Sequence, residues 1–180
     1  MILYNSPRGR GGSFDKNMNM KPIALALSLL WTAIVSHAQI NSTQNKTIME
    51  NKMTIQHFYE QVLNAHNLAS VSDFVSSDYT DSEGQRGVAA FTAGIQELVK
   101  AFPDIHYTLA GLTAEDDRVA VSWTWTGTHK EQFRKYAATG KHITSTGMAI
   151  FTLKDGKITG INLQTDRLGF LEALGAIPQP

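Results

Sequence analysis

Asp166 is the residue of this sequence best placed for proton-transfer chemistry. It ends an alternating segment whose polar face consists of Asn162, Gln164 and Asp166. If helices cover that polar face, burial raises the pKa of the carboxyl and makes it an acid or base near neutral pH. The alternative is that the face meets water and that Asp166 caps the helix that follows it.

Aromatic residues mark a second candidate site on an earlier strand. Trp123 and Trp125 share one face with Val119 and Val121, and Tyr107 lies in a comparable position on the preceding strand. Such a stripe is typical of core packing, and a platform for a ligand is the alternative. Because each indole N–H needs a hydrogen-bond partner, a partly polar cavity would suit both tryptophans.

The histidines are scattered and predict no metal site. No H-x-x-x-H or H-x-H spacing occurs among His57, His66, His106, His129 and His142. His129 follows a predicted strand end, where a loop can close over a pocket, and a plain surface histidine is the alternative. No G-x-S-x-G, P-loop or G-x-G-x-x-G motif is present either, so three large enzyme classes lack their usual marker in this sequence.

Composition narrows the classes of protein further. Sixteen Lys and Arg balance sixteen Asp and Glu, so no basic field exists to collect phosphates and nucleic-acid binding is not expected. Cysteine is absent, which excludes disulfides, thiolate nucleophiles and sulfur-ligated zinc.

The N-terminal region has the pattern of a signal peptide. Lys21 precedes an apolar run over residues 23–35 that is shorter than the roughly 20 residues needed to span a bilayer. Small residues then predict cleavage after Ala38, with translation starting at Met18 or Met20. The alternative is a buried or membrane-anchoring helix. We therefore expect a periplasmic or secreted protein, with a signal segment over 1–38, a linker over 39–46, a domain over 47–177 and no membrane association after cleavage.

The elements that must position Asp166 and the aromatic residues follow from the hydrophobic period. Residues 47–64, 68–75 and 87–102 have helical spacing, and Pro103 ends the last of these helices. After Pro103 the period becomes alternating, which predicts strands near 105–110, 119–126, 142–153 and 157–166, with a tight hairpin turn at Asp155-Gly156. A brief strand at 78–81 and a last short helix near 168–174 complete the pattern. Helices followed by antiparallel strands predict an α+β fold with helices covering one face of a curved sheet.

Seven short motifs, in order and at sensible spacing, resemble the SnoaL-like polyketide cyclase and ester cyclase family of the NTF2-like superfamily. The resemblance covers about residues 50–176. The motifs are Phe58-Tyr59-Glu60, Ala101-Phe102-Pro103-Asp104, Asp117-Arg118-Val119-Ala120-Val121, Gly127-Thr128-His129, Thr139-Gly140-Lys141, Asp155-Gly156-Lys157-Ile158, and Asp166-Arg167-Leu168-Gly169 with Leu174-Gly175.

The resemblance implies a cone of bent antiparallel sheet around the helices, a pocket in its mouth and a homodimer formed through the outer face of the sheet. It also implies that Asp166 is the acid/base of a ring closure that needs no metal or cofactor, with Trp123, Trp125, Tyr107, Gln164, Asn162 and His129 around the small-molecule substrate. Asn162 stands where the family often has an aromatic residue, and Ser82 where it commonly has histidine. Thr152 and His142 are candidates for a second polar partner.

Three functions fit this sequence. The first is a cofactor-free enzyme that uses Asp166 on a carbonyl-bearing or otherwise acidic small molecule, as a cyclase, isomerase or hydrolase. The second is a non-catalytic binding domain of the cell envelope for an apolar compound, and the third is a dimerising scaffold whose cone is filled by side chains. Fold alone does not choose among them.

Overall fold

A computed structural model describes residue 39 and residues 42–81 and 84–177 of the 180-residue chain. Ser42 to Pro180 form one compact unit. The predicted signal segment lies outside the described residues, as does Ser82. Within the described residues, no helix is long and apolar enough to cross a membrane.

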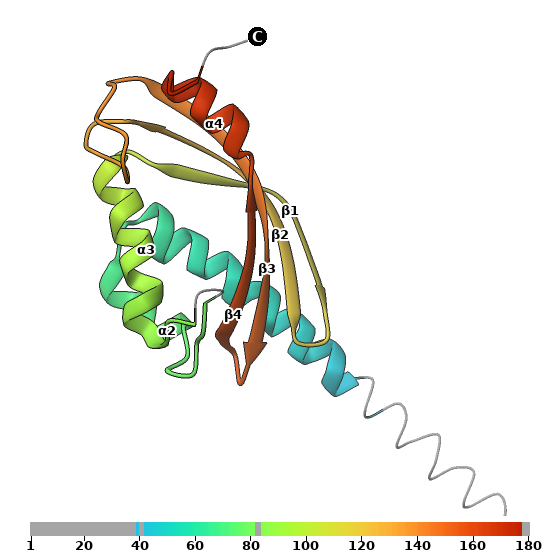
Figure 1. Cartoon of the computed structure of the whole chain (residues 1–180). Coiled ribbons are helices and arrows are strands. Elements are labelled where there is room, and N and C mark those ends of the chain that lie inside the picture. The colour runs from blue at the N-terminus through green and yellow to red at the C-terminus, as the bar shows by residue number, and fades with distance from the viewer. Residues whose placement is uncertain (1–38, 40–41, 82–83, 178–180) are drawn as a thin grey trace, which may run out of the picture. The chain divides into compact units, whose positions relative to one another are not determined.

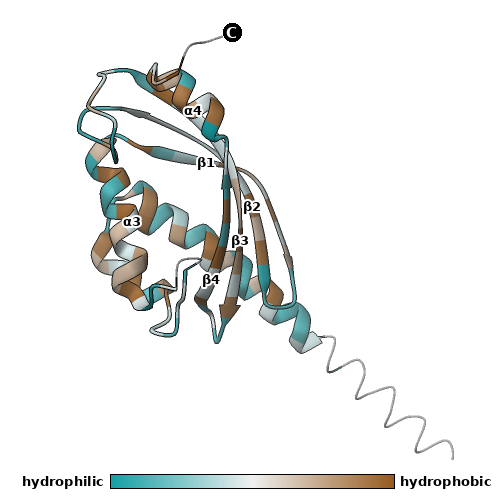
Figure 2. Cartoon of the chain, viewed as in Figure 1, coloured by the Kyte–Doolittle hydropathy of each residue, from teal (hydrophilic) through white to brown (hydrophobic). Residues whose placement is uncertain are grey.

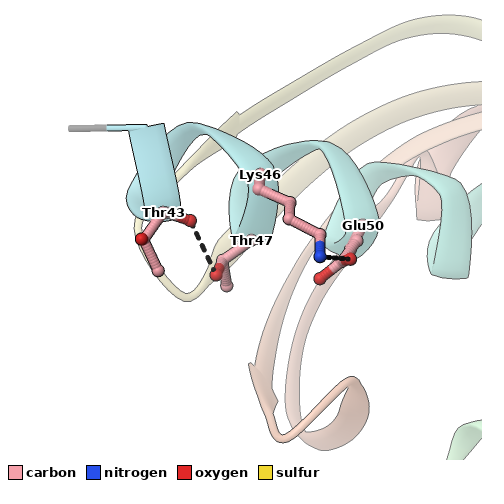
Figure 3. Close-up of polar contacts among 4 residues, drawn as sticks. All are labelled: Thr43, Lys46, Thr47 and Glu50. Carbon is pink, nitrogen blue, oxygen red and sulfur yellow. Dashed lines mark hydrogen bonds and ion pairs between the residues drawn. The ribbon is translucent and has the colours of Figure 1, made fainter. Parts of the chain in front are cut away.

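The first helix of this unit occupies residues 42–57 and continues as a wider π-helical segment, η1 (Phe58–Asn64). Residues 42–46, which were predicted to be a linker, are therefore helical. Figure 3 shows two local contacts of this part of the helix. The Thr47 hydroxyl donates to the carbonyl of Thr43 at 3.2 Å, and Lys46 pairs with Glu50 one turn later at 3.7 Å.

Three further helices follow the predicted pattern. A short turn, η2 (Leu68–Ser70), leads into α2 (Val71–Phe74), and α3 (Gly87–Ala101) ends two residues before Pro103. The last helix, α4 (Arg167–Leu174), ends at Gly175, whose φ of 77° is the left-handed conformation that glycine adopts most easily. The predicted strand at 78–81 is reduced to a single bridge between Thr80 and Arg86.

In the described part of the chain, four antiparallel strands form a sheet in sequence order. Figure 1 shows that the strands are long and bent, with the helices on their concave side. A tight turn at Asp155-Gly156, both with positive φ, joins the last two strands as predicted. The strands are β1 (His106–Glu115), β2 (Arg118–Thr128), β3 (His142–Lys154) and β4 (Lys157–Thr165).

The core lies between the concave face of the sheet, called the inner face below, and the helices. Phe58 is at its centre and makes edge contacts with the rings of Phe74, Phe91 and Phe151, at centroid separations of 5.6 to 6.1 Å. Apolar and polar residues alternate along the strands in Figure 2. Burial of the apolar set on the helix side is the main force that holds the helices against the sheet.

Candidate functional site

The strand register places Asn162 and Gln164 on the outer face of the sheet. Asn162 pairs with Ile150 and Gln164 pairs with Met148, and paired residues of antiparallel strands project to the same side. Ile150 and Met148 are 40% and 52% exposed, whereas Leu163 pairs with the buried Ala149 of the inner face. The condition for an enclosed Asp166, that helices cover the polar face of β4, is therefore not met. The helices cover the apolar face, because burying unpaired amides would cost more than it gains.

Asp166 lies at the junction of β4 and α4 and is exposed. Its backbone N–H donates to the carbonyl of Thr146 at 3.0 Å, which extends the strand pairing by one residue. Its Oδ1 accepts a hydrogen bond from the backbone N–H of Gly169 at 2.9 Å. The predicted enclosure of this carboxyl is thus not observed in the single chain, because the side chain satisfies an N–H at the start of α4.

The aromatic candidates lie together on the inner face. Trp123 and Trp125 are buried on β2, and Tyr107 is half-buried on β1 beside them. The ring centroids of Tyr107 and Trp123 are 5.5 Å apart, at 78°. Trp125 contacts Phe102 at 5.1 Å. The structure therefore brings these three residues together on the opposite face of the sheet from Asn162 and Gln164.

His129 is fully buried, so the surface alternative is wrong. It stacks on Phe102, with ring centroids 5.0 Å apart and planes at 22°. Its Nδ1 accepts from the backbone N–H of Thr139 at 3.3 Å, so the proton of the neutral ring is on Nε2. Burial lowers the pKa of the imidazole, which favours that neutral form. Nε2 has no hydrogen-bond partner within the described part of the protein.

The inner face is open where β4 ends. Leu163 projects to this face, yet it is 51% exposed. Thr165, two residues further along the same face, is also exposed, and so is Leu168 in the first turn of α4. Exposed apolar side chains on a face that is otherwise buried mark a surface suited to an apolar ligand. Asp166 follows this open part at the junction of β4 and α4, where it pairs with Thr146 and continues the polar alternation of Asn162 and Gln164.

Two surface clefts lie elsewhere. One, of about 460 Å³, borders the hairpin turns at Asp116, Asp117 and Asp155. No group of three His, Cys, Asp or Glu in the ranges described has an arrangement that could hold a metal ion. The second, of about 370 Å³, lies on the outer face and is lined by residues that include Thr152 and Asn162. Neither cleft includes Asp166 or an inner-face aromatic residue.

The two candidate polar partners are not brought to Asp166. Thr152 pairs with Arg118 and Gly160 on the outer face. His142 begins β3, four residues before the Thr146 that pairs with Asp166, and its Nδ1 lies 3.4 Å from the Thr128 hydroxyl.

Sequence reasoning missed two residues of this region, one on the first helix and one on the inner face. Tyr59 of η1 is buried against Tyr107, with ring centroids 5.6 Å apart. Gly147 of β3 lies beneath the Trp123 ring, and a Cβ built there would overlap the indole and lie 2.6 Å from the carbonyl oxygen of Gln164. Tyr59 belongs to the apolar stripe of the first helix, and no local signal separates it from a packing residue.

The helices, the bent antiparallel sheet and the partly open inner face define an α+β cone of the NTF2-like type. The family model for the SnoaL-like polyketide cyclases matches residues 53–174, so the chain belongs to that family. The resemblance predicted from the motifs is confirmed. A search of curated proteins finds no match.

Solved structures agree with this fold. A candidate polyketide cyclase from Acidithiobacillus ferrooxidans is 30% identical, with a TM-score of 0.64 over 71% of this chain and 95% of its own. TsrD from Streptomyces laurentii is 21% identical, with a TM-score of 0.67 over 72% and 97%. AclR from Streptomyces galilaeus, a candidate hydroxylase, is 24% identical, with a TM-score of 0.66 over 74% and 85%. The last two similarities concern the fold alone.

Proposed function

We propose that the protein binds an apolar small molecule on the open part of the inner face and that Asp166 exchanges a proton with it. The observation that carries this proposal is the neighbourhood of Leu163 and Asp166. An exposed apolar side chain of the inner face lies three residues before an exposed carboxylate at the junction of β4 and α4. Membership of the SnoaL-like family supports a small-molecule ligand.

The proposed step is removal of an acidic C–H proton next to a carbonyl group. The C–H bond breaks, its electron pair moves onto the carbonyl oxygen to form an enolate, and the carboxylate of Asp166 takes the proton. Return of the proton to a different carbon completes an isomerisation. In a ring closure the enolate carbon forms a C–C bond with a second carbonyl carbon of the same ligand, the π electrons of that carbonyl move onto its oxygen, and the alkoxide takes the proton back from Asp166. This step balances without a metal, an oxidant or a reductant.

A ketone with an activated C–H, 2-tetralone, provides a direct test. Its exchange of hydrogen for deuterium in D₂O is followed by NMR, with wild-type protein and with Asp166→Asn. General acid–base catalysis typically accelerates a reaction by roughly 10²–10⁴-fold. Asp166→Asn should therefore return the rate of deuterium exchange to that of the buffer alone. Asparagine caps helices about as well as aspartate does, so this variant keeps the Gly169 hydrogen bond and the fold. Full exchange activity in Asp166→Asn would show that another group is the base.

A second function is favoured by one specific observation. The carboxylate of Asp166 already accepts a hydrogen bond from Gly169, which is the role of a structural cap. A non-catalytic domain that sequesters or senses an apolar compound needs nothing more from this residue. It predicts that the wild-type protein binds 2-tetralone without accelerating its exchange, and that Asp166→Asn binds it equally well.

We also propose that the protein is exported and acts on an external compound. The signal-like sequence before Gln39 supports this location, and export separates the protein from cytoplasmic polyketide synthesis. Expression of the full chain, fractionation and mass spectrometry of the N-terminus should give a periplasmic or secreted protein that begins at Gln39. An intact N-terminus in the cytoplasmic fraction would contradict export.

The outer face of the sheet is the surface that we propose for homodimer formation. Met148 and Ile150 are exposed side by side with the paired Gln164 and Asn162 of β4. An apolar patch within a polar surface is typical of an interface between copies.

A further inference from the structure

Three hydrogen-bond donors lie in contact within the inner face. The Tyr59 ring packs edge-on against Tyr107, and Tyr107 packs edge-on against Trp123, at centroid separations of 5.6 and 5.5 Å. They come from three elements, η1, β1 and β2. Tyr59 also contacts Phe151 of β3, at 6.2 Å, so its ring lies between the first helix and the middle of the sheet.

Within the described residues, one of the three polar groups is buried without a hydrogen-bond partner. The indole Nε1 of Trp123 is buried and makes no hydrogen bond, and the residue as a whole is 4% exposed. Asn64 hydrogen-bonds to the backbone N–H and carbonyl of Tyr107, and the hydroxyls of Tyr59 and Tyr107 are not among the buried groups without a partner. Polar groups inside proteins are almost always paired, so the unpaired indole N–H of Trp123, with two phenols beside it, calls for an explanation in terms of function.

All three groups are donors at any physiological pH. Burial raises the pKa of Tyr59 and of Tyr107, so both phenols keep their protons. The negative charge that Tyr107 would carry if ionised raises the pKa of Tyr59 further, so the two hydroxyls interact electrostatically. The Trp123 indole can only donate. The ligand group that fits the Trp123 N–H is therefore a hydrogen-bond acceptor, and the two protonated phenols can donate to the same atom.

We propose that Tyr59, Tyr107 and Trp123 form a donor cluster that binds a carbonyl or enolate oxygen of the ligand. The inference rests on the proposed binding of a small molecule to the inner face, and it names the chemical class of that ligand as an apolar compound with a carbonyl oxygen. In the proton-transfer step, negative charge develops on that oxygen. Donors that are fixed in place before the reaction stabilise such charge more than they stabilise the neutral carbonyl.

The cluster lies beside the end of β4 that leads to Asp166. The Trp123 ring covers Gly147 on β3, and Gly147 pairs with Thr165, the residue before Asp166. Neighbouring strands are about 4.8 Å apart, so the backbones of Trp123 and Thr165 are roughly 10 Å apart, and the indole spans part of that distance.

The position of Tyr59 in a π-helical segment is a second, independent feature. Such segments are rare, and they occur frequently at functional sites. Here the wider turn carries Tyr59, Val62 and Leu63 on its buried side.

The test compares two ligands that share one skeleton. The ketone 2-tetralone has the acceptor oxygen, and tetralin lacks it. The dissociation constant of each is measured by tryptophan fluorescence titration of the wild-type protein and of Tyr59→Phe, Tyr107→Phe and Trp123→Phe. A second readout is the carbon-13 shift of labelled 2-tetralone, which moves downfield when its carbonyl accepts hydrogen bonds.

We expect the wild type to prefer the ketone, and each variant to lose roughly 3–10-fold of that preference while tetralin affinity stays unchanged. The downfield carbonyl shift should shrink in the same variants. Tyr79→Phe is the matched control, because Tyr79 is an equally buried tyrosine that packs on Phe91 and contacts none of the three rings.

Each outcome decides one claim. An unchanged ketone preference and carbonyl shift in all three variants would overturn the donor cluster while leaving ligand binding intact. Failure of the wild type to bind either compound would overturn the proposed function and the cluster together. Ketone preference that depends on the cluster, without deuterium exchange, supports the cluster in a binding protein and removes only the acid/base role of Asp166.

Discussion

The inner and outer faces of the sheet differ in what their side chains do. On β2 the inner residues Val119, Val121, Trp123 and Trp125 are buried, while the outer residues between them are half-buried and small or hydroxylated. The inner face packs large rings against the helices, and its unpaired polar groups are donors. The outer face carries small polar residues and two exposed apolar side chains on β3. Because only the inner face is tightly packed, matched substitutions on the two faces should have unequal effects on stability.

The largest difference is expected between two neighbours on β3. Phe151 is 1% exposed on the inner face and contacts the rings of Phe58 and Tyr59, whereas Ile150 projects from the outer face. Phe151→Ala should lower the free energy of unfolding by about 3–5 kcal/mol, through lost burial and a residual cavity. Ile150→Ala should change it by less than about 1 kcal/mol in the monomer. Urea denaturation measures both, and equal losses would contradict the assignment of faces.

Two glycines provide a second matched pair. A methyl group at Gly147 would overlap the Trp123 ring, while one at Gly160 on the outer face meets only Thr152, at 3.9 Å. Gly147→Ala should therefore cost about 1–3 kcal/mol, as overpacking does. Gly160→Ala should be neutral within about 0.5 kcal/mol. Thermal denaturation compares the two, and tryptophan fluorescence reports the displaced indole. A silent Gly147→Ala would mean that Trp123 does not lie over this strand.

The alternation of residues predicted the strands closely, because a strand has only two faces and the period shows which residues share one. The hairpin at Asp155-Gly156 was equally predictable, since few residues accept positive φ at both turn positions. The period does not say which face the helices cover. Which face of β4 the helices cover depends on the register of β4 with β3. In that register Ile161 pairs with Phe151 and Leu163 pairs with Ala149.

Asp166 and Tyr59 show why the site was harder to predict than the fold. A carboxylate before a short helix has the same local pattern whether it is a cap or a base, and only the surrounding packing separates the two roles. Tyr59 fits an apolar helix stripe as well as phenylalanine would. Whether its hydroxyl finds a partner depends on β1 and β2, which lie more than forty residues away in the sequence.

A smaller effect on stability is expected from the protonation of His129 at low pH. Burial lowers the pKa of this imidazole in the folded protein, while in the unfolded chain it stays near 6.5. Between those two values the unfolded state binds more protons, so stability is complete above about pH 6.5 and falls as the pH drops below it. His129→Gln should flatten this fall. Chemical denaturation between pH 5 and pH 8 gives the slope.

The control for that experiment lies on the outer face. His106 is exposed and pairs with Thr126 there, so His106→Gln should leave the pH slope as in the wild type. If His106→Gln flattens the slope as much as His129→Gln does, the pH dependence does not come from burial at the inner face.

The smallest effect on monomer stability, with a large effect on assembly, is expected on the outer face. Met148→Lys places a charge on a position that is already 52% exposed, so the free energy of unfolding of the monomer should change by no more than about 0.5 kcal/mol. If copies pair through this face, two buried ammonium groups without partners would oppose association. Analytical ultracentrifugation should show a wild-type dimer and a Met148→Lys monomer, while Lys154→Glu, at the exposed end of β3, should remain dimeric. A wild-type monomer, or a Met148→Lys dimer of unchanged affinity, would exclude this face as the interface and leave its apolar residues as ordinary surface.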